Sequence, residues 1–234
     1  MLVNALREGR YSRSRIAAQL DAFRTPITDL LRPLLDDPDP GVRQWGATLL
    51  GRYADPEIEL ELATLIVDDD PQVRSAVIKS LSANSSRLAA PAAVTALGDP
   101  IWFVRVHAAR ALGRLGKAEL APEIVALLAD PQWWVRSAAK ESLQELGPRA
   151  EPAVLHALKS EDVFVRNGAA EVLQNMGVVD ELMQRLEQSP EDELALRTLR
   201  SIFQGGGPAI ADAARRRAVA DGSSGVADVL DGLA

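Results

Sequence analysis

A Val-Arg pair recurs through the middle of this chain at an almost constant interval, and no other feature constrains the fold as strongly. The pairs are Val42-Arg43, Val73-Arg74, Val104-Arg105, Val135-Arg136 and Val165-Arg166, which lie 31, 31, 31 and 30 residues apart. A fixed period of this length indicates an array of supersecondary units, none of which can bury its hydrophobic face alone. The chain is therefore expected to fold as a stack of similar units.

The residues that follow each valine predict an amphipathic helix. A small or apolar residue stands four positions after the valine, and a leucine stands eight positions after it in every copy. Positions separated by four residues share one face of an α-helix, so these residues would form a buried stripe. In three copies a glycine follows (Gly116, Gly147 and Gly177), as a left-handed C-terminal cap requires.

A first helix is expected ahead of each valine, which makes every unit a helix pair. Apolar residues stand eleven and seven positions before the valine, as Leu31 and Leu35 do in the first copy, and this spacing of four is again helical. An aspartate between the helices is expected to cap the second helix. Asp-Pro pairs supply it at Asp37-Pro38, Asp70-Pro71, Asp99-Pro100 and Asp130-Pro131.

The predicted fold class is all-α, an α-solenoid formed by a superhelical stack of helix pairs with a repeat of about 31 residues. We expect one solenoid over residues 1–234. Its parts are an N-terminal cap helix (1–25), five regular repeats (26–177), a degenerate sixth repeat (178–204) and a C-terminal cap (205–234). In the sixth repeat Leu194, Thr198 and Ile202 are expected to keep the period, with Ala195 in place of the arginine.

Composition narrows the classes of function. Hydrophobic residues make up 47% of the chain, and there is no cysteine, which excludes disulfides and thiolate metal sites. The 33 acidic and 26 basic side chains give a net charge of −7, so nucleic acid is not an expected partner. The N-terminus lacks the apolar core of a signal peptide and no long apolar run occurs, so we expect a cytoplasmic protein without membrane insertion.

The best copies of the repeat, Asp99–Gly116 and Asp130–Gly147, share the motif Asp-Pro-x-aromatic-aromatic-Val-Arg followed by spaced Ala, Leu and Gly. This motif resembles the short HEAT-like repeats of the phycobilisome-lyase type, over about residues 26–204. Members of that family serve as phycobilin lyase subunits and as general protein-binding scaffolds. The resemblance implies that the repeated arginine pairs with turn acids of adjacent layers, although an anion-binding groove is an alternative role. This arginine ladder comprises Arg43, Arg74, Arg105, Arg136 and Arg166.

Five aromatic residues stand directly before the repeat valine in three consecutive copies. These helix-start aromatics are Trp102, Phe103, Trp133, Trp134 and Phe164. In the family that the chain resembles, second helices line the concave surface, so the aromatics would form a ridge that anchors a partner protein or peptide. The competing expectation is that one aromatic of each pair packs between layers. Arg110, Glu141 and Glu171, farther along these helices, are expected to form a polar rim.

The leading functional hypothesis is a non-enzymatic scaffold or adaptor that binds another protein on its second-helix face. The resemblance also allows a phycobilin lyase-like subunit acting on a bilin-carrying protein and, more remotely, a HEAT-like alkylpurine DNA glycosylase. We expect no catalytic residue, cofactor or metal site. His156 has no partner at ligand spacing, His107 is expected to pack against its neighbours, and Asp68-Asp69-Asp70 lacks a calcium-loop pattern.

Overall fold

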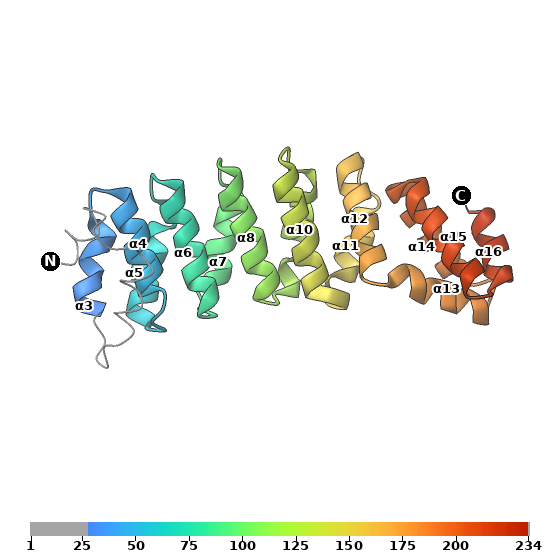
Figure 1. Cartoon of the computed structure of the whole chain (residues 1–234), viewed down its shortest axis with the longest axis horizontal. Helices are drawn as coiled ribbons and strands as arrows, with labels where there is room; N and C mark the ends of the chain where they lie inside the picture. Colours follow the sequence, from blue (N-terminus) through green and yellow to red (C-terminus); the bar gives the residue numbers. More distant parts are fainter. Residues whose placement is uncertain (1–27, 234) are drawn as a thin grey trace. The chain divides into compact units, whose positions relative to one another are not determined.

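The computed structural model describes residues 28–233, and within that range its regular elements are all helices (Figure 1). The predicted all-α class is confirmed. The predicted N-terminal cap helix lies outside the described residues. The chain divides into two compact units, the first ending at Leu115 and the second beginning at Gly116. The single solenoid over residues 1–234 and its internal boundaries stay predictions.

The first unit is a stack of helix pairs in which a short first helix leads into a longer second helix. Some of the first helices end in a 3-10 turn, which tightens the last turn before the connection. The second helices α4, α6 and α8 pack side by side. In chain order the elements are α3 (Thr28–Leu31), η1 (Arg32–Asp36), α4 (Pro40–Leu50), α5 (Pro56–Thr64), η2 (Leu65–Val67), α6 (Pro71–Ala83), α7 (Ala89–Ala96) and α8 (Trp102–Arg114).

The second unit repeats this arrangement and closes with one further helix pair. Its second helices are α10, α12 and α14, and α15 packs against α16 after them. In chain order the elements are η3 (Ala118–Leu120), α9 (Ala121–Ala126), η4 (Leu127–Ala129), α10 (Trp133–Leu146), η5 (Gly147–Ala150), α11 (Glu151–Ala157), α12 (Val163–Asn175), α13 (Val178–Gln188), α14 (Glu193–Gly206), α15 (Pro208–Ala220) and α16 (Ser224–Asp231).

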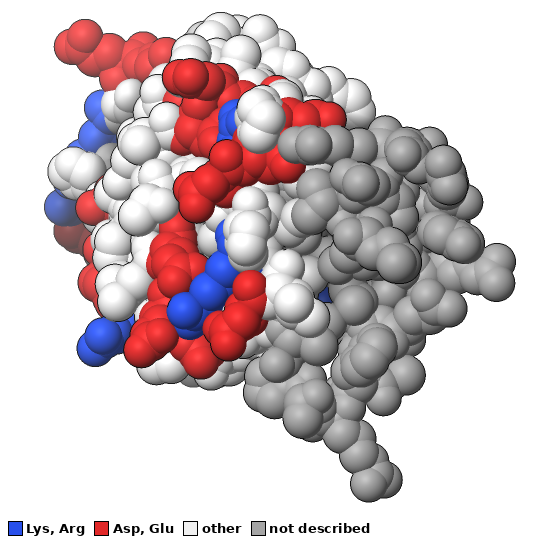
Figure 2. All heavy atoms as spheres, turned by 90° about the vertical axis from the view of Figure 1, so that its left-hand side faces the viewer, with Lys and Arg blue, Asp and Glu red and all other residues white. Residues whose placement is uncertain are grey.

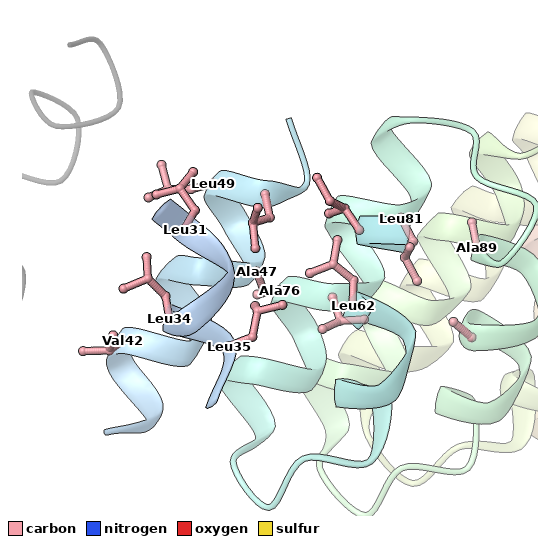
Figure 3. Close-up of a cluster of buried hydrophobic side chains, with 14 residues drawn as sticks. Leu31, Leu34, Leu35, Val42, Ala47, Leu49, Leu62, Ala76, Leu81 and Ala89 are labelled. Atoms are coloured by element: carbon pink, nitrogen blue, oxygen red, sulfur yellow. The ribbon is translucent and has the colours of Figure 1, made fainter. Parts of the chain in front are cut away.

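The five regular second helices bury the stripe that the sequence predicts. The repeat valines are at most 8% exposed, and the leucines eight positions later are at most 1% exposed. Figure 3 shows how this stripe contributes to the core of the first unit, where Val42 and Leu81 lie among leucines of the first-helix segments, such as Leu34 and Leu62. Fully burying one such side chain contributes about 1.5–3 kcal/mol, so the periodic leucines and valines contribute substantially to the stacking of the helices.

Three second helices end at the glycines that the sequence singled out. Gly116, Gly147 and Gly177 have φ angles of 65°, 62° and 84°. A side chain at such a φ would clash with the following carbonyl, so glycine is the residue that ends the helix there without strain.

The structure corrects the predicted role of the turn aspartates. Of the four in Asp-Pro pairs, only Asp70 caps a second helix, accepting hydrogen bonds from the Gln72 and Val73 amides at 2.7 and 3.3 Å. The other three lie five residues before the valine, not three, and each accepts from the amide two positions later, at 2.8 to 2.9 Å; they are Asp37, Asp99 and Asp130. Their equivalent in the second copy is Asp68, so the Asp-Pro pairs mix two different positions of the repeat.

In the first unit, the aspartates five residues before the valine receive the arginine of the preceding copy. Arg74 Nε and Nη2 donate to Asp99 Oδ2 and Oδ1 at 2.6 and 2.8 Å. Arg43 makes the same two-pronged pair with Asp68, with both distances 2.8 Å. The remaining Nη1 of each arginine donates to carbonyl oxygens of its own turn. Each guanidinium therefore ties its own turn to the turn of the next layer.

The other arginines of the ladder keep the carbonyl contacts of this arrangement. Arg105, Arg136 and Arg166 each donate from Nη1 to the two carbonyls five and six residues earlier, at 2.7 to 3.3 Å. In the fifth copy the aspartate is replaced by Ser160, which leaves Arg136 without a carboxylate partner among residues 28–233. Its guanidinium carbon lies instead 4.6 Å from the centre of the Phe164 ring.

The ion pairs change the titration of the two turn carboxyls. Burial would raise the pKa of Asp68, but hydrogen bonds from Arg43 and from the Asp70 amide outweigh burial, and the pKa lies below its ordinary value of 3.8. Burial would likewise raise the pKa of Asp99, but hydrogen bonds from Arg74 and from the Ile101 amide outweigh burial, and the pKa is lowered. The charged form of both aspartates is thus favoured by the folded state.

We expect Arg74→Met to destabilise the fold by about 3 kcal/mol, because it leaves the Asp99 carboxylate buried without its partner. Arg166→Met is the matched control, since Arg166 makes the same carbonyl contacts but no ion pair with any described residue. It should cost about 1 kcal/mol. Urea unfolding followed by circular dichroism measures both, and equal costs for the two variants would contradict the role given to the ion pair.

The free energy of unfolding should also decrease as the pH is lowered through the range in which Asp99 becomes protonated. Because the pKa of Asp99 is lower in the folded than in the unfolded chain, its contribution is complete above about pH 4 and is lost as the pH falls through the folded value. The Asp99→Asn variant lacks this contribution. Urea midpoints measured from pH 6 to about pH 2.5 should therefore converge for the wild type and the variant as the pH falls. A constant difference between the two curves would refute this linkage.

Candidate partner-binding site

The aromatic residues lie at the first two positions of the second helices. Each follows an extended residue at the helix N-cap, namely Ile101, Gln132 or Asp162. The valine three positions after this residue is the first side chain of the helix to enter the core. The two positions in between stand before the buried stripe that begins at this valine.

In the second unit these side chains form an exposed aromatic cluster. Trp133 and Trp134 contact each other edge to face, with ring centroids 4.7 Å apart and an interplanar angle of 77°. They are 55% and 58% exposed, and Phe164 is 53% exposed. The guanidinium of Arg136 lies over the Phe164 ring and makes a cation–π contact with it. We name Trp133, Trp134 and Phe164 the aromatic cluster.

The first unit contributes one pair, Trp102 and Phe103, at the start of α8. Their rings meet edge to face, with centroids 5.8 Å apart. Trp102 is 40% exposed and Phe103 is half-buried. Phe103 is thus the less exposed member of this pair, whereas both members of the Trp133-Trp134 pair are more than half exposed.

Two exposed apolar residues of the second unit were missed by the sequence analysis. Val163 is 49% exposed and stands beside Phe164 at the first position of α12. Leu194 is 63% exposed and occupies the second position of α14, the position that Trp134 and Phe164 hold in their helices. Exposed apolar side chains therefore occur at the start of all three second helices in this unit.

The prediction for the sixth repeat was wrong by one residue. Asp192 caps α14, accepting from the Leu194 and Ala195 amides at 3.1 and 3.0 Å. The core stripe consequently runs through Ala195 and Leu199, both fully buried, and Leu194 lies outside it. The residue in the place of the repeat arginine is Leu196, not Ala195. The cap aspartate three positions before the stripe was the signal that could have set this register.

The three residues expected to form a polar rim are all exposed. Arg110 belongs to α8 in the first unit, and Glu141 and Glu171 belong to α10 and α12 in the second. Each stands six residues after the repeat valine of its copy. Glu171 is already engaged, since its carboxylate accepts a hydrogen bond from Lys140 Nζ at 2.6 Å.

The second unit also has a groove, which is formed by first helices and not by second helices. It has a volume of about 710 Å³ and lies between the first helices α9 and α11. Its walls are mostly alanine, valine and proline, with His156 and Lys159 at one side. None of the helix-start aromatics lines it, so the groove and the aromatic cluster are separate features of this unit.

Within residues 28–233, no three histidine, aspartate or glutamate side chains converge in a way that could hold a metal ion. Every helix in the same range is too short or too polar to traverse a lipid bilayer.

Comparison with known proteins adds a family. Four overlapping segments match HEAT repeats, 27–102, 58–144, 90–173 and 121–220, and together they cover most of the chain. A chain in the complex of CpcE and CpcF of phycocyanin lyase from Nostoc sp. is similar, with a TM-score of 0.51 and 21% identity over 91% of this chain and 97% of that chain. The archaeal HEAT-like repeats protein from Thermococcus onnurineus has a TM-score of 0.49 and 18% identity over 90% and 99%. At these identities the likeness concerns the fold alone. A comparison with curated protein sequences finds no match.

The corrected register of α14 predicts opposite effects for two leucines that are only five positions apart. Leu194→Ala should change the free energy of unfolding by less than about 0.5 kcal/mol, because the side chain is exposed. Leu199→Ala should cost about 2–5 kcal/mol, because it opens a cavity in the core. Urea unfolding of both variants tests the register. A large loss of stability in Leu194→Ala would instead support the sequence-based register, in which Leu194 belongs to the core stripe.

Proposed function

We propose that this chain, which belongs to the HEAT-repeat family, is a scaffold that binds another protein on the face formed by its second helices. A stack of helix pairs presents an extended surface to which every layer contributes equivalent positions. The proposed anchors are the helix-start aromatics of each unit.

The exposed aromatic cluster of the second unit carries the proposal. Trp133, Trp134 and Phe164 are all more than half exposed, at a cost in hydration that the isolated chain does not recover. Tryptophan is the residue most enriched at the energetic centre of protein interfaces, because it buries a large area at little entropic cost. Two adjacent exposed tryptophans are therefore better explained by a partner than by the needs of folding.

The surroundings of the cluster suit a protein more than a small molecule. Sites for small ligands are concave and enclose most of the ligand, whereas these rings project from the starts of two helices. Glu141 and Glu171 lie along the same helices and would form the polar rim that surrounds an apolar interface core. In the first unit Trp102 and Arg110 would act as anchor and rim in the same way.

The decisive test removes the two tryptophans. The Trp133→Ser/Trp134→Ser variant should keep its helicity and melting temperature but no longer retain the partner that immobilised wild type captures from a host lysate. Loss of such hot-spot residues costs roughly 2–4 kcal/mol each, enough to abolish capture. Val219→Ser is the matched control, because it removes another exposed apolar side chain of the same unit.

The control should capture the same partner as wild type. If the folded double variant also captures it at wild-type yield, the aromatic cluster is not the binding site.

A further inference from the structure

Two arginines of the second unit make only part of the interaction that joins the layers of the first unit. In Arg43 and Arg74, Nη1 donates to carbonyl oxygens of the arginine's own turn, and the Nε–Nη2 edge donates to the aspartate of the next turn. Arg136 and Arg166 keep the carbonyl contacts, at 2.7 to 3.2 Å. Among residues 28–233, neither of these two has a hydrogen-bond acceptor for its Nε–Nη2 edge.

The sequence explains both open edges. The turn aspartate stands five residues before the repeat valine, and this position is Ser160 in the fifth copy. In the sixth copy, where Ala195 takes the place of the valine, the position is Pro190. Ser160 keeps the amide contact of the aspartate, since its Oγ accepts a hydrogen bond from the Asp162 amide at 3.2 Å. A serine has no second oxygen that could accept from the guanidinium edge.

The carboxylates that follow Ser160 do not replace the turn aspartate. Asp162 caps α12, where one of its oxygens accepts from two backbone amides at 2.7 and 3.2 Å. Glu161 is exposed and forms no ion pair with any residue in the described part of the chain. In the second copy, Asp68-Asp69-Asp70 holds the same three positions, and the first of the three pairs with Arg43. The first position of the turn is therefore the one that an arginine of the preceding copy reaches.

The open edge of Arg136 belongs to a side chain that already contacts the aromatic cluster. Its guanidinium carbon lies 4.6 Å from the centre of the Phe164 ring, and Trp133 begins the same helix three residues earlier. Arg136 is half-buried, whereas both rings are more than half exposed. A cation beside exposed apolar rings is complementary to a ligand that carries a negative charge next to apolar groups.

We infer that Arg136 binds an aspartate or glutamate side chain of the partner protein, in the place that Asp68 and Asp99 hold in the first unit. The inference rests on the proposed function and specifies what the aromatic cluster binds, a segment in which an acidic residue is flanked by apolar ones. The carboxylate accepts from Nε and Nη2, as Asp99 does from Arg74 at 2.6 and 2.8 Å. The apolar neighbours of the acidic residue cover the exposed rings.

An acidic residue of a protein segment fits this site better than nucleic acid does. A nucleic acid is a polyanion whose affinity grows with the number of phosphates that a protein neutralises. Glu161 and Asp162 adjoin the site, the chain has a net charge of −7, and on the face shown in Figure 2 acidic side chains cover more of the described surface than basic ones. A protein segment can present one carboxylate to Arg136 and uncharged residues to the surrounding acids.

The test uses peptides that are selected without regard to their composition. Random peptides displayed on phage are selected on the immobilised full-length chain, and the enriched peptides are synthesised with a fluorescent label. Those that require Trp133 and Trp134 for binding should contain an aspartate or glutamate next to apolar residues. Replacing this acid by its amide should raise the Kd at least about tenfold, because a charge-assisted pair is lost. Peptides that require the two tryptophans but contain no acidic residue would overturn the inference.

The Ser160→Asp variant locates the site, because it restores the turn aspartate within the chain. This carboxylate should pair with Arg136 and exclude the acid of the peptide, which raises the Kd of the acidic peptide at least about tenfold. The amide version of the peptide should bind wild type and Ser160→Asp equally. Ser160→Asn is the matched control, since asparagine has nearly the size of aspartate but no charge, and it should bind the acidic peptide as wild type does. Equal binding of the acidic peptide to Ser160→Asp and Ser160→Asn would contradict the inference.

The same two variants test the geometry without any ligand. If the Nε–Nη2 edge of Arg136 faces this position, the carboxylate introduced by Ser160→Asp forms the ion pair that the first unit contains. The urea midpoint of Ser160→Asp should then exceed that of Ser160→Asn, as followed by circular dichroism. A midpoint that is equal or lower would overturn the inference, because Arg136 would then not reach the position of the turn aspartate.

The remaining outcomes separate this inference from the proposed function. Peptides that depend on Trp133 and Trp134 but bind Ser160→Asp as tightly as wild type would overturn the inference and leave the scaffold proposal standing. Peptides that depend on neither would count against the aromatic cluster itself. Labelled single-stranded DNA that displaces the acidic peptides and binds more tightly would identify the occupant as nucleic acid, and self-association in light scattering that Ser160→Asp abolishes would identify it as a second copy. Either result overturns the inference.

Discussion

The first unit depends on one interaction, the two-pronged pair between a second-helix arginine and the turn aspartate 25 residues later. Hydrophobic burial drives the helices together, but it is not directional and would tolerate many offsets between layers. The guanidinium has a fixed geometry, and it holds its own turn through carbonyl oxygens and the next turn through a carboxylate. Each layer is thereby set against the next at one spacing and one rotation, so the starts of successive second helices, and whatever side chains they carry, recur at regular places.

The second unit contains an arginine, Arg136, that lacks this pair with a turn aspartate among the described residues. Where Ser160 replaces the aspartate, Arg136 keeps its carbonyl contacts but places its guanidinium over the Phe164 ring. Arg136 thus contacts both the carbonyl oxygens of its own turn and a ring of the exposed aromatic cluster. The absence of this carboxylate removes one structural tie, and the same arginine then contacts a ring of the candidate site, so that scaffold and candidate site use the same side chain.

The fold could be predicted because the residues at buried positions form a periodic pattern in the sequence. The valine, the small residue and the leucine recur at helical spacing, and their burial follows from that spacing alone. The prediction failed where this pattern is less regular. In the sixth repeat both Leu194 and Ala195 fit an apolar pattern, and only the cap formed by Asp192 distinguishes them. The turn aspartates were misassigned because Asp-Pro occurs at two positions of the repeat. The exposure of both Trp133 and Trp134 could not be predicted either, since residues ahead of the first buried position belong to no periodic pattern.

The sixth position after the repeat valine shows what this construction allows. In successive copies it is Thr48, Lys79, Arg110, Glu141 and Glu171, so its charge changes sign while the valine and leucine of the same helix stay buried. Selection can therefore act on recognition and on folding through different residues of one helix. Under the proposed function, single substitutions at this position, each nearly neutral for stability, would exchange one partner for another, and duplication of a copy would add one more such position to the surface.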